Sequence, residues 1–367
     1  MFVVVDDKIP YIRETIEKIA DRVLYLPGKE FTKDKIKNAD ALIIRTRTRC
    51  NRQLLEDTNV KFIASATMGY DHIDTEYCKQ AGITWTNCPG CNASSVGQYD
   101  KTVLIRLAMA KRLVPEKTTV GIVGVGNAGS AVARAIRPLG VKLMFNDPPR
   151  EKKCKDLSEN DQAYFSANPA QHEILPAPFF PVKQWHTLDE LAEKCDLIVF
   201  HVPLIYKGEY PTHYLANSTF FKKLKRHPVI LNAGRGGVID ESALLTALDN
   251  GTVKEAVIDT WENEPDINRQ LLEKTFIGTP HIAGYSADGK ANATRMSLEA
   301  LCNFFGISRQ IIITPPEMSP SDYWNKTQKE LQLYDPEADS QRLKRYPDKF
   351  EYLRGNYPLR RERRDEK

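Results

Sequence analysis

The sequence predicts an α/β protein built on two separate parallel sheets. The first observation is a rhythm of short apolar runs that alternate with helical patterns, which is typical of parallel sheets. The second is one complete strand, glycine turn, helix and strand unit between Thr119 and Asp147. The third is that the first ninety residues contain several predicted strands but no glycine turn of this kind. We therefore expect two α/β domains with different tasks.

In the first ninety residues, four short runs rich in apolar residues predict the strands of the first domain. Helical patterns lie between them, such as Tyr11–Ile19, and a longer helical pattern from about Ser94 to Arg112 leads into the second domain. The predicted strands are Phe2–Val5, Ala41–Ile44, Phe62–Ala64 and Ile83–Trp85.

The second domain opens with a glycine fingerprint. The apolar run Val120–Val123 is followed at once by Gly-Val-Gly-Asn-Ala-Gly at 124–129. Gly124 permits the tight turn, Gly126 lets the backbone approach a pyrophosphate, and Gly129 lets helix and strand pack closely. The N-terminus of the following helix offers N–H groups to phosphates. This pattern predicts a Rossmann-type dinucleotide site.

The continuation of this unit makes the assignment specific. A helical stretch is closed by Gly140, a second strand covers Val141–Phe145, and Asp147 follows 18 residues after Gly129, where an acid binds the adenosine ribose. A carboxylate there repels the 2′-phosphate of NADP, so we expect NAD. Arg150 is a counter-argument, but we expect Pro148-Pro149 to turn its side chain away. The alternative is a glycine turn that binds no ligand. The strand, the glycine fingerprint, the helix, the second strand and the acid follow one another at the expected spacing, which disfavours this alternative.

Downstream runs complete the second domain. Leu197–Phe200, Val229–Leu231 and Glu255–Ile258 predict further buried strands. Residues 151–186 are polar and then proline-rich, which indicates a surface insertion. Ser297–Phe305 predicts a helix, and the chain then becomes a polar, basic tail that contains tyrosines.

Composition fits a globular protein of two or three domains. Of 367 residues, 41% are hydrophobic and 27% charged, and the net charge of +4 comes from the tail, so we expect no nucleic-acid partner. The N-terminus lacks the features of a signal peptide, and no apolar run has membrane-spanning length. Seven scattered cysteines favour reduced thiols in the cytoplasm. Cys88-Pro-Gly-Cys91 leaves a redox or zinc site as an alternative, but we expect no metal, because two further ligands are not evident.

Three polar residues downstream of the fingerprint are candidates for chemistry. Arg235 follows Val229–Leu231, Glu264 follows the strand that ends near Asp259, and His281 follows Ile277-Gly-Thr-Pro. A guanidinium can grip a carboxylate through two hydrogen bonds, and a histidine oriented by a carboxylate can accept a hydroxyl proton. Each residue alone also has a structural interpretation. Three such residues at strand ends of one nucleotide domain favour catalysis.

Several motifs together resemble the D-isomer-specific 2-hydroxyacid dehydrogenases. Besides the fingerprint, they are Ala64–Asp74, Pro89–Ala93, the loop Asn232–Gly237 around Arg235, and Thr279–His281. Further details resemble a branch of this family that oxidises a small phosphorylated 2-hydroxy acid at C2 with NAD. These details are Asp147–Arg150, His201–Leu204, Lys207–Tyr210, Ile277–Tyr285 and Gly289–Ala291.

The resemblance implies a role for each matching position. Arg235 would bind the substrate carboxylate, His281 would be the acid/base, and Glu264 would be its partner. Arg45, Thr67 and Tyr285 would bind the phosphorylated substrate. The residues expected to line NAD are Gly124, Gly126, Asn127, Ala128, Gly129, Asp147, Val202, Ala233, Gly234, Arg235, Asp259 and Gly284. Alternation would also send Arg45, Arg47 and Arg49 to one side after Ala41–Ile44, although a solvated basic edge is the alternative.

The resemblance also implies a domain plan. Residues 1–93 and 282–306 would form a flavodoxin-like α/β substrate domain, and 94–281 a Rossmann-type doubly wound NAD-binding domain. Residues 307–367 would be a small C-terminal dimerisation segment, which makes a homodimer the expected assembly. Leu343, Tyr346, Phe350 and Leu353 are spaced to share one helical face that could pair with a second copy.

Three departures and two alternatives stay open. Residues 151–186 are longer than the resemblance expects, Gln98 stands where the family often has glutamate, and Val202 replaces a hydroxyl residue. Another member of the family, acting on phosphoglycerate or D-lactate, is one alternative function. A non-catalytic NAD-sensing protein of the corepressor kind is the other, since such proteins can keep the three catalytic residues.

Overall fold

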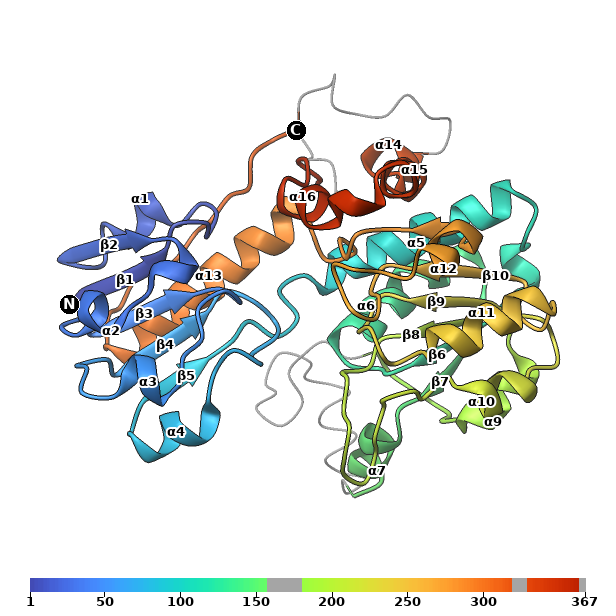
Figure 1. The fold of residues 1–367 in the computed structure, drawn as a ribbon, viewed down its shortest axis with the longest axis horizontal. Helices are drawn as coiled ribbons and strands as arrows, with labels where there is room; N and C mark the ends of the chain where they lie inside the picture. The colour runs from blue at the N-terminus through green and yellow to red at the C-terminus, as the bar shows by residue number, and fades with distance from the viewer. Residues whose placement is uncertain (157–179, 319–328, 363–367) are drawn as a thin grey trace. The chain divides into compact units, whose positions relative to one another are not determined.

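The computed structural model describes residues 1–156, 180–318 and 329–362 (Figure 1). Their contacts divide the chain into two compact units. Within the described residues, the first unit holds 1–92 and 286–318, and the second holds 93–285 and 329–362. Part of the predicted insertion at 151–186 therefore lies outside the described residues.

The first unit contains a five-stranded parallel sheet in the order β2-β1-β3-β4-β5. This is the flavodoxin-like order, in which the chain changes direction across the sheet between β1 and β3. Ligands bind such sheets outside the carboxyl ends of the strands at this switch point. The strands are β1 (Phe2–Asp6), β2 (Arg22–Leu26), β3 (Ala41–Ile44), β4 (Phe62–Ser65) and β5 (Thr84–Thr86).

Helices cover both faces of this sheet, as the alternation of its side chains requires. Val3 and Ile43 point to the face covered by Leu298 and Leu301 of the long helix α13, whereas Val4 belongs to the core on the other face. The α-helices of the unit are α1 (Arg13–Ile16), α2 (Lys33–Ile36), α3 (Arg52–Leu55), α4 (Thr75–Gln80) and α13 (Ala287–Phe304).

The second unit contains a six-stranded parallel sheet in the order β11-β10-β9-β8-β6-β7. Its switch point lies between β6 and β8. Beyond β7, Trp185 makes an isolated parallel bridge to Phe145. The strands are β6 (Thr119–Val123), β7 (Lys142–Asn146), β8 (Leu197–Phe200), β9 (Val229–Asn232), β10 (Glu255–Ile258) and β11 (Ile277–Gly278).

Two helices beside the glycine turn approach each other closely. A Cβ atom at Gly97 of α5 would lie 2.9 Å from the carbonyl oxygen of Ala131 in α6, so only glycine fits there. The α-helices of this unit are α5 (Ala93–Met109), α6 (Asn127–Ile136), α7 (Pro148–Asp156), α9 (Leu188–Lys194), α10 (Ser218–Lys222), α11 (Glu241–Asp249), α12 (Arg269–Lys274), α14 (Lys329–Leu333), α15 (Pro336–Arg345) and α16 (Phe350–Gly355).

The C-terminal tail differs from its prediction. Residues 307–318 belong to the first unit and 329–362 to the second, so 307–367 is not a unit of its own. The predicted single helical face is also wrong, because α15 ends before Pro347 and α16 starts anew at Phe350. Leu343 and Phe350 are buried in the core of the second unit, whereas Tyr346 is exposed.

Two further elements differ from the sequence analysis. The edge strand β2 was not expected, and α13 begins at Ala287 instead of near Ser297, with the hydroxyl of Ser286 accepting a hydrogen bond from the N–H of Gly289. The first turn of α13 contains Gly289, which favours helix poorly. A capping serine and packing against the sheet compensate for it.

Candidate functional site

Three neighbouring strands of the second unit carry the predicted catalytic residues. Arg235 follows β9, Glu264 follows β10, and His281 follows β11, and these strands pair in parallel register. The carboxyl ends of parallel strands lie at one edge of a sheet, so the topology brings the loops of the three predicted residues to the same edge.

His281 and Glu264 form a hydrogen-bonded pair. Nδ1 of His281 lies 2.8 Å from Oε2 and 3.1 Å from Oε1 of Glu264. Oε1 also accepts the backbone N–H of Trp261 at 2.9 Å. Burial alone would raise the pKa of Glu264, but the hydrogen bond and charge of His281, the N–H of Trp261 and the charge of Arg354 hold it below its usual value. The carboxylate is thus fixed and ionised beside the imidazole.

The backbone of the His281 loop is held by Asp259. This carboxylate is 1% exposed and accepts hydrogen bonds from the hydroxyl of Thr279 at 2.6 Å and from the N–H groups of Ile282 at 2.7 Å and Ala283 at 2.9 Å. Burial raises its pKa. These bonds fix a loop in which His281 has φ 56°, an unusual conformation for a residue other than glycine. Asp259 therefore positions the histidine.

The Arg235 loop passes close to two neighbouring segments. A Cβ at Gly234 would lie 2.9 Å from the carbonyl oxygen of Phe200, and one at Gly236 would overlap the backbone of Trp261. Arg235 is half-buried and donates from Nη1 to the carbonyl oxygen of Gly234 at 2.8 Å. The two glycines thus hold the loop of Arg235 between the ends of β8 and β10.

The predicted nucleotide loop has the shape of a cradle. Gly124 has φ 86°, and a Cβ there would press on Val202 and the carbonyl oxygen of His201, whereas a Cβ at Gly129 would overlap the carbonyl oxygen of Gly124. At Gly126, by contrast, a Cβ would meet none of the described atoms within 4 Å. The chain itself gives no reason for glycine at 126. The open space beside Gly126 is consistent with the predicted close approach of a dinucleotide to the backbone.

Asp147 faces this loop, and Arg150 differs from its prediction. The carboxylate of Asp147 accepts the N–H of Val125 at 2.8 Å and that of Arg150 at 3.1 Å. The guanidinium of Arg150 does not turn away after Pro148-Pro149. It donates to the carbonyl oxygen of Val125, because these prolines start α7 instead of a turn that would redirect the side chain.

The first unit holds the other predicted substrate residues at strand ends. Arg45 follows β3 at the switch point and is half-buried, and Thr67 follows β4 and donates its hydroxyl to the carbonyl oxygen of Gly69 at 2.9 Å. The predicted alternation of Arg45, Arg47 and Arg49 is wrong, because the chain turns after Ile44, and the other two arginines are exposed.

Lys290, at the start of α13, was assigned no role from the sequence. It is half-buried in the first unit, and burial and the charge of Arg45 lower its pKa. The motif Gly289–Ala291 was the signal that could have identified it.

Two arginines of the tail, Arg354 and Arg360, were not identified from the sequence. Nη1 of Arg354 lies 3.7 Å from Oε2 of Glu264, and its Nε donates to the phenol oxygen of Tyr285 at 3.2 Å. Arg360 is buried and donates to Gln98 at 2.8 Å and to the carbonyl oxygen of Ser95 at 2.7 Å, so Gln98 has a structural partner. Residues Phe350–Arg361 also resemble the family faintly, which was the available signal, but the spacing of residues alone does not show where a tail packs.

The described part of the chain contains no group of three histidine, cysteine, aspartate or glutamate residues arranged to hold a metal ion. None of its seven cysteines forms a disulfide, and Cys88 lies against the carbonyl oxygens of Ser65 and Ala293 in the first unit. Of the helices that are described, none has the length and hydropathy to cross a membrane.

Comparison with known proteins gives close relatives over nearly the whole chain. The erythronate-4-phosphate dehydrogenase of Bacteroides thetaiotaomicron is 52% identical, with 99% of this chain and 97% of the relative covered. The enzyme of the same name from Porphyromonas gingivalis is 38% identical, with 99% and 94% covered. Residues 165–283 match the profile described as D-isomer specific 2-hydroxyacid dehydrogenase, NAD binding domain.

Solved structures are similar at the level of the fold. The D-lactate dehydrogenase of Aquifex aeolicus, solved with NAD and lactic acid, has a TM-score of 0.59 and 21% identity, with 84% of this chain and 96% of that chain covered. The TT0316 protein of Thermus thermophilus has a TM-score of 0.63 and 24% identity, with 86% and 99% covered.

Proposed function

Because the chain belongs to the erythronate-4-phosphate dehydrogenases, within the D-isomer-specific 2-hydroxyacid dehydrogenase family, we propose that it oxidises the C2 hydroxyl of 4-phospho-D-erythronate with NAD. The product is 3-hydroxy-2-oxo-4-phosphooxybutanoate, and the reaction belongs to pyridoxal 5′-phosphate biosynthesis. The observation that carries the proposal is the His281–Glu264 pair, with the Arg235 loop at the same sheet edge.

The three residues divide the chemistry among them. Since Nδ1 of His281 faces Glu264, Nε2 is the nitrogen that accepts the hydroxyl proton. The carboxylate of Glu264 orients the ring and stabilises the imidazolium that forms. Arg235 binds the substrate carboxylate and stabilises the developing carbonyl oxygen.

NAD supplies the acceptor for the hydride that leaves C2. Gly124, Gly126 and Gly129 shape the loop for its pyrophosphate, and Asp147 binds its ribose. The remaining residues proposed to line NAD are Asn127, Ala128, Val202, Ala233, Gly234, Arg235, Asp259 and Gly284. Val202 would contribute methyl contacts, and Asp259 acts chiefly on the loop of His281, since three donors of the chain already occupy its carboxylate.

The substrate is a dianionic or trianionic small molecule, which requires cations and hydrogen-bond donors. In the first unit, we assign Arg45 and Thr67 to the phosphorylated substrate. In the second unit, we assign Tyr285. We further propose a homodimer and a cytoplasmic location, the latter because the seven cysteines carry no disulfide.

The test is an NADH-appearance assay with 4-phospho-D-erythronate, D-3-phosphoglycerate and D-lactate, run side by side. We expect kcat/KM for 4-phospho-D-erythronate to exceed the other two by at least about a hundredfold, because both anionic ends must be matched. The His281→Ala variant is the matched control: it should bind NADH normally but turn over about 10²–10⁴-fold more slowly. Equal activity on D-lactate would refute the substrate assignment.

A further inference from the structure

One cation of the C-terminal tail contacts two groups of the proposed site within the second unit. The guanidinium of Arg354 approaches Oε2 of Glu264 at 3.7 Å, and this is the same oxygen that lies 2.8 Å from Nδ1 of His281. Nε of Arg354 donates to the phenol oxygen of Tyr285, and the guanidinium carbon lies 5.7 Å from the centre of that ring. Arg354 thus joins the acid/base pair to a proposed substrate residue.

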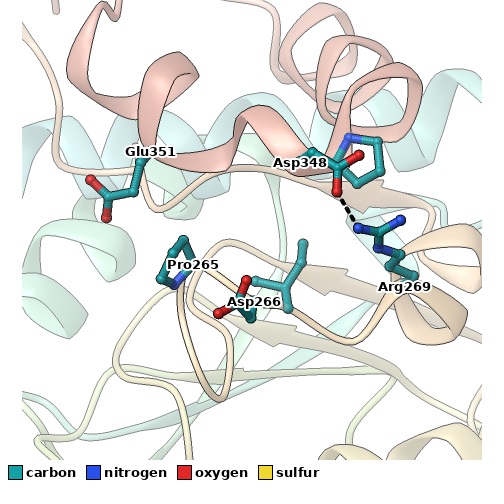
Figure 2. Close-up of a pocket in the computed structure, with 7 residues that line it drawn as sticks. Pro265, Asp266, Arg269, Asp348 and Glu351 are labelled. Carbon is teal, nitrogen blue, oxygen red and sulfur yellow. Dashed lines mark hydrogen bonds and ion pairs between the residues drawn. The ribbon is translucent and has the colours of Figure 1, made fainter.

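The segment around Arg354 is anchored to its unit. Phe350, one turn earlier in α16, is 1% exposed and shares a core with Trp261. Figure 2 shows how the tail meets the loop after Glu264: Pro265 and Asp266 face Asp348 and Glu351 across a surface pocket, and Asp348 pairs with Arg269. The helix α16, which carries Arg354, is therefore held in place by the core of the second unit.

The charge at this position is stable, and Arg354 lies among groups that become negative when they ionise. Burial would lower the pKa of Arg354, but Tyr285 and Glu264 beside it raise that pKa overall, so the guanidinium stays charged. The groups that act on the catalytic pair or on Arg354 come from several elements: Glu241 at the start of α11, Asp259 after β10, Tyr285 after β11 and Glu351 in α16.

In the hydrogen bond between Arg354 and Tyr285, donor and acceptor can be assigned. An arginine can only donate hydrogen bonds, so the phenol oxygen is the acceptor in this pair. The phenol proton can then be donated to a further acceptor. A phosphorylated hydroxy acid offers acceptors at both anionic ends, which matches the role proposed for Tyr285.

We propose that Arg354 is a positioning residue of the dehydrogenase reaction. It holds the Glu264 carboxylate against His281, limits how strongly that carboxylate favours the imidazolium, and orients Tyr285 as a donor to the substrate. The proposal rests on the proposed function. In the oxidation, the hydroxyl proton passes to Nε2 of His281, the hydride leaves C2 for NAD, and the C2–O bond becomes a carbonyl.

The sign of the electrostatic effect follows from the charges. A cation near the pair opposes protonation of the imidazole, and only the neutral imidazole can accept the hydroxyl proton. Removing the cation therefore favours the protonated ring, so the oxidation rate reaches its half-maximum at a higher pH. For a partly exposed cation we expect a shift of about half a pH unit.

The test compares Arg354→Gln with Arg354→Lys. For Arg354→Gln we expect kcat to fall about tenfold, KM for the phosphorylated acid to rise several-fold, KM for NAD to stay unchanged, and the acidic limb of the pH–rate profile to move upward. Arg354→Lys keeps the charge and should restore the pH profile, while KM stays raised because a lysine does not reproduce the planar guanidinium geometry.

Two tail variants serve as matched controls. Arg345→Gln removes an exposed cation of α15, and Asp348→Asn breaks the exposed ion pair between the tail and Arg269 at the start of α12. Both should leave the pH profile unchanged. A pH profile of Arg354→Gln that superimposes on the wild type overturns the proposal, even if kcat has fallen, because a merely structural defect would give that result.

A second readout separates this proposal from the proposed function. The NMR signals of the His281 ring can be followed as a function of pH without any substrate. The midpoint of this titration should rise by about half a pH unit in Arg354→Gln. If the wild type oxidises none of the three acids, the function is wrong, whereas an unchanged NMR midpoint refutes the role of Arg354. Should Arg354→Gln not fold, as judged by thermal melting, a displaced midpoint in Arg354→Lys would also refute it.

Discussion

At the scale of single residues, Asp147 and Arg150 set the environment of the proposed ribose site. The carboxylate of Asp147 accepts two backbone N–H groups, one of them from the glycine loop, and Arg150 donates to a carbonyl oxygen of the same loop. In the proposed site, the carboxylate of Asp147 would repel a 2′-phosphate, whereas the nearby guanidinium of Arg150 would attract it. The preference for NAD depends on the balance between these two side chains.

We predict that Asp147→Ala weakens NAD and relaxes the exclusion of NADP. KM for NAD should rise about tenfold, since a charge-assisted hydrogen bond is worth roughly 1.5–3 kcal/mol, and the ratio of kcat/KM for NAD over NADP should fall further. Asp147→Asn separates the two effects, because an amide oxygen can still accept the N–H of Val125 but does not repel phosphate. A wild-type protein that prefers NADP would refute this interpretation.

The positions of the three proposed catalytic residues were predictable, and that of Arg354 was not. Arg235, Glu264 and His281 each follow a strand of one parallel sheet, so local patterns place them at one edge. Arg354 reaches Glu264 only through the tertiary packing of a tail, 354 − 264 = 90 residues further along the chain. Nothing in its sequence spacing encodes that contact.

At the scale of elements, the turn between β6 and α6 contains glycines whose presence has different physical reasons. Gly129 is required by the chain, because any Cβ would overlap the carbonyl oxygen of Gly124. Glycine is not required by the chain at position 126, because the described atoms leave room for a Cβ there. The φ of −73° at this position also suits other residues. The difference offers a matched pair of substitutions.

We predict that Gly126→Ala folds normally but binds NAD at least tenfold more weakly, since its methyl group occupies the space of the pyrophosphate. Gly129→Ala should instead lower the melting temperature, because helix and strand must separate. Thermal melting and fluorescence titration with NADH measure the two properties. Normal NADH affinity in a folded Gly126→Ala would show that the loop does not hold the pyrophosphate.

Most strands were predictable because both sheets are parallel and buried on two faces, which makes their sequences continuous apolar runs. The edge strand β2 was not predicted. Arg22 is exposed, and three of the five residues of β2 are only half-buried, so the strand is not buried on both faces. In the tail, the spacing of Leu343 and Phe350 indicated one face, but Pro347 divides the segment, and the apolar side chains pack into the core of their own unit.

At the scale of the whole molecule, a buried carboxyl links stability to pH. Burial raises the pKa of Glu241 to about 7, and Glu262 and Glu264 nearby also disfavour its charge. Between its ordinary pKa of 4.5 and about 7, the folded chain keeps a proton that the unfolded chain loses. The free energy of unfolding therefore falls as pH rises through this window, by at most about 3 kcal/mol.

We predict that Glu241→Gln removes this loss of stability. The amide oxygen can still accept the N–H of Glu262, which lies 2.7 Å from Oε1 of Glu241, so the loop is kept. The variant should gain melting temperature over the wild type at pH 8 and little at pH 5. A difference of equal size at both pH values would contradict the assignment.

The proposed homodimer needs a surface other than the buried side chains of the tail. Leu343 and Phe350 are used within their own unit, so deleting the tail would damage that unit instead of yielding intact monomers. Tyr346 and Tyr352 remain, 42% and 63% exposed on the same tail, and exposed aromatic side chains are enriched at interfaces.

If the tail mediates dimerisation, we expect these two tyrosines to take part, since they are the exposed aromatic side chains among its described residues. We predict that the double variant Tyr346→Ser, Tyr352→Ser elutes as a monomer in light-scattering chromatography, while its melting temperature stays close to that of the wild type, because neither ring contributes to the core. The exposed Tyr206, outside the tail, gives a control variant, Tyr206→Ser, that should remain dimeric. A double variant that still elutes as a dimer would place the interface on another surface of the chain.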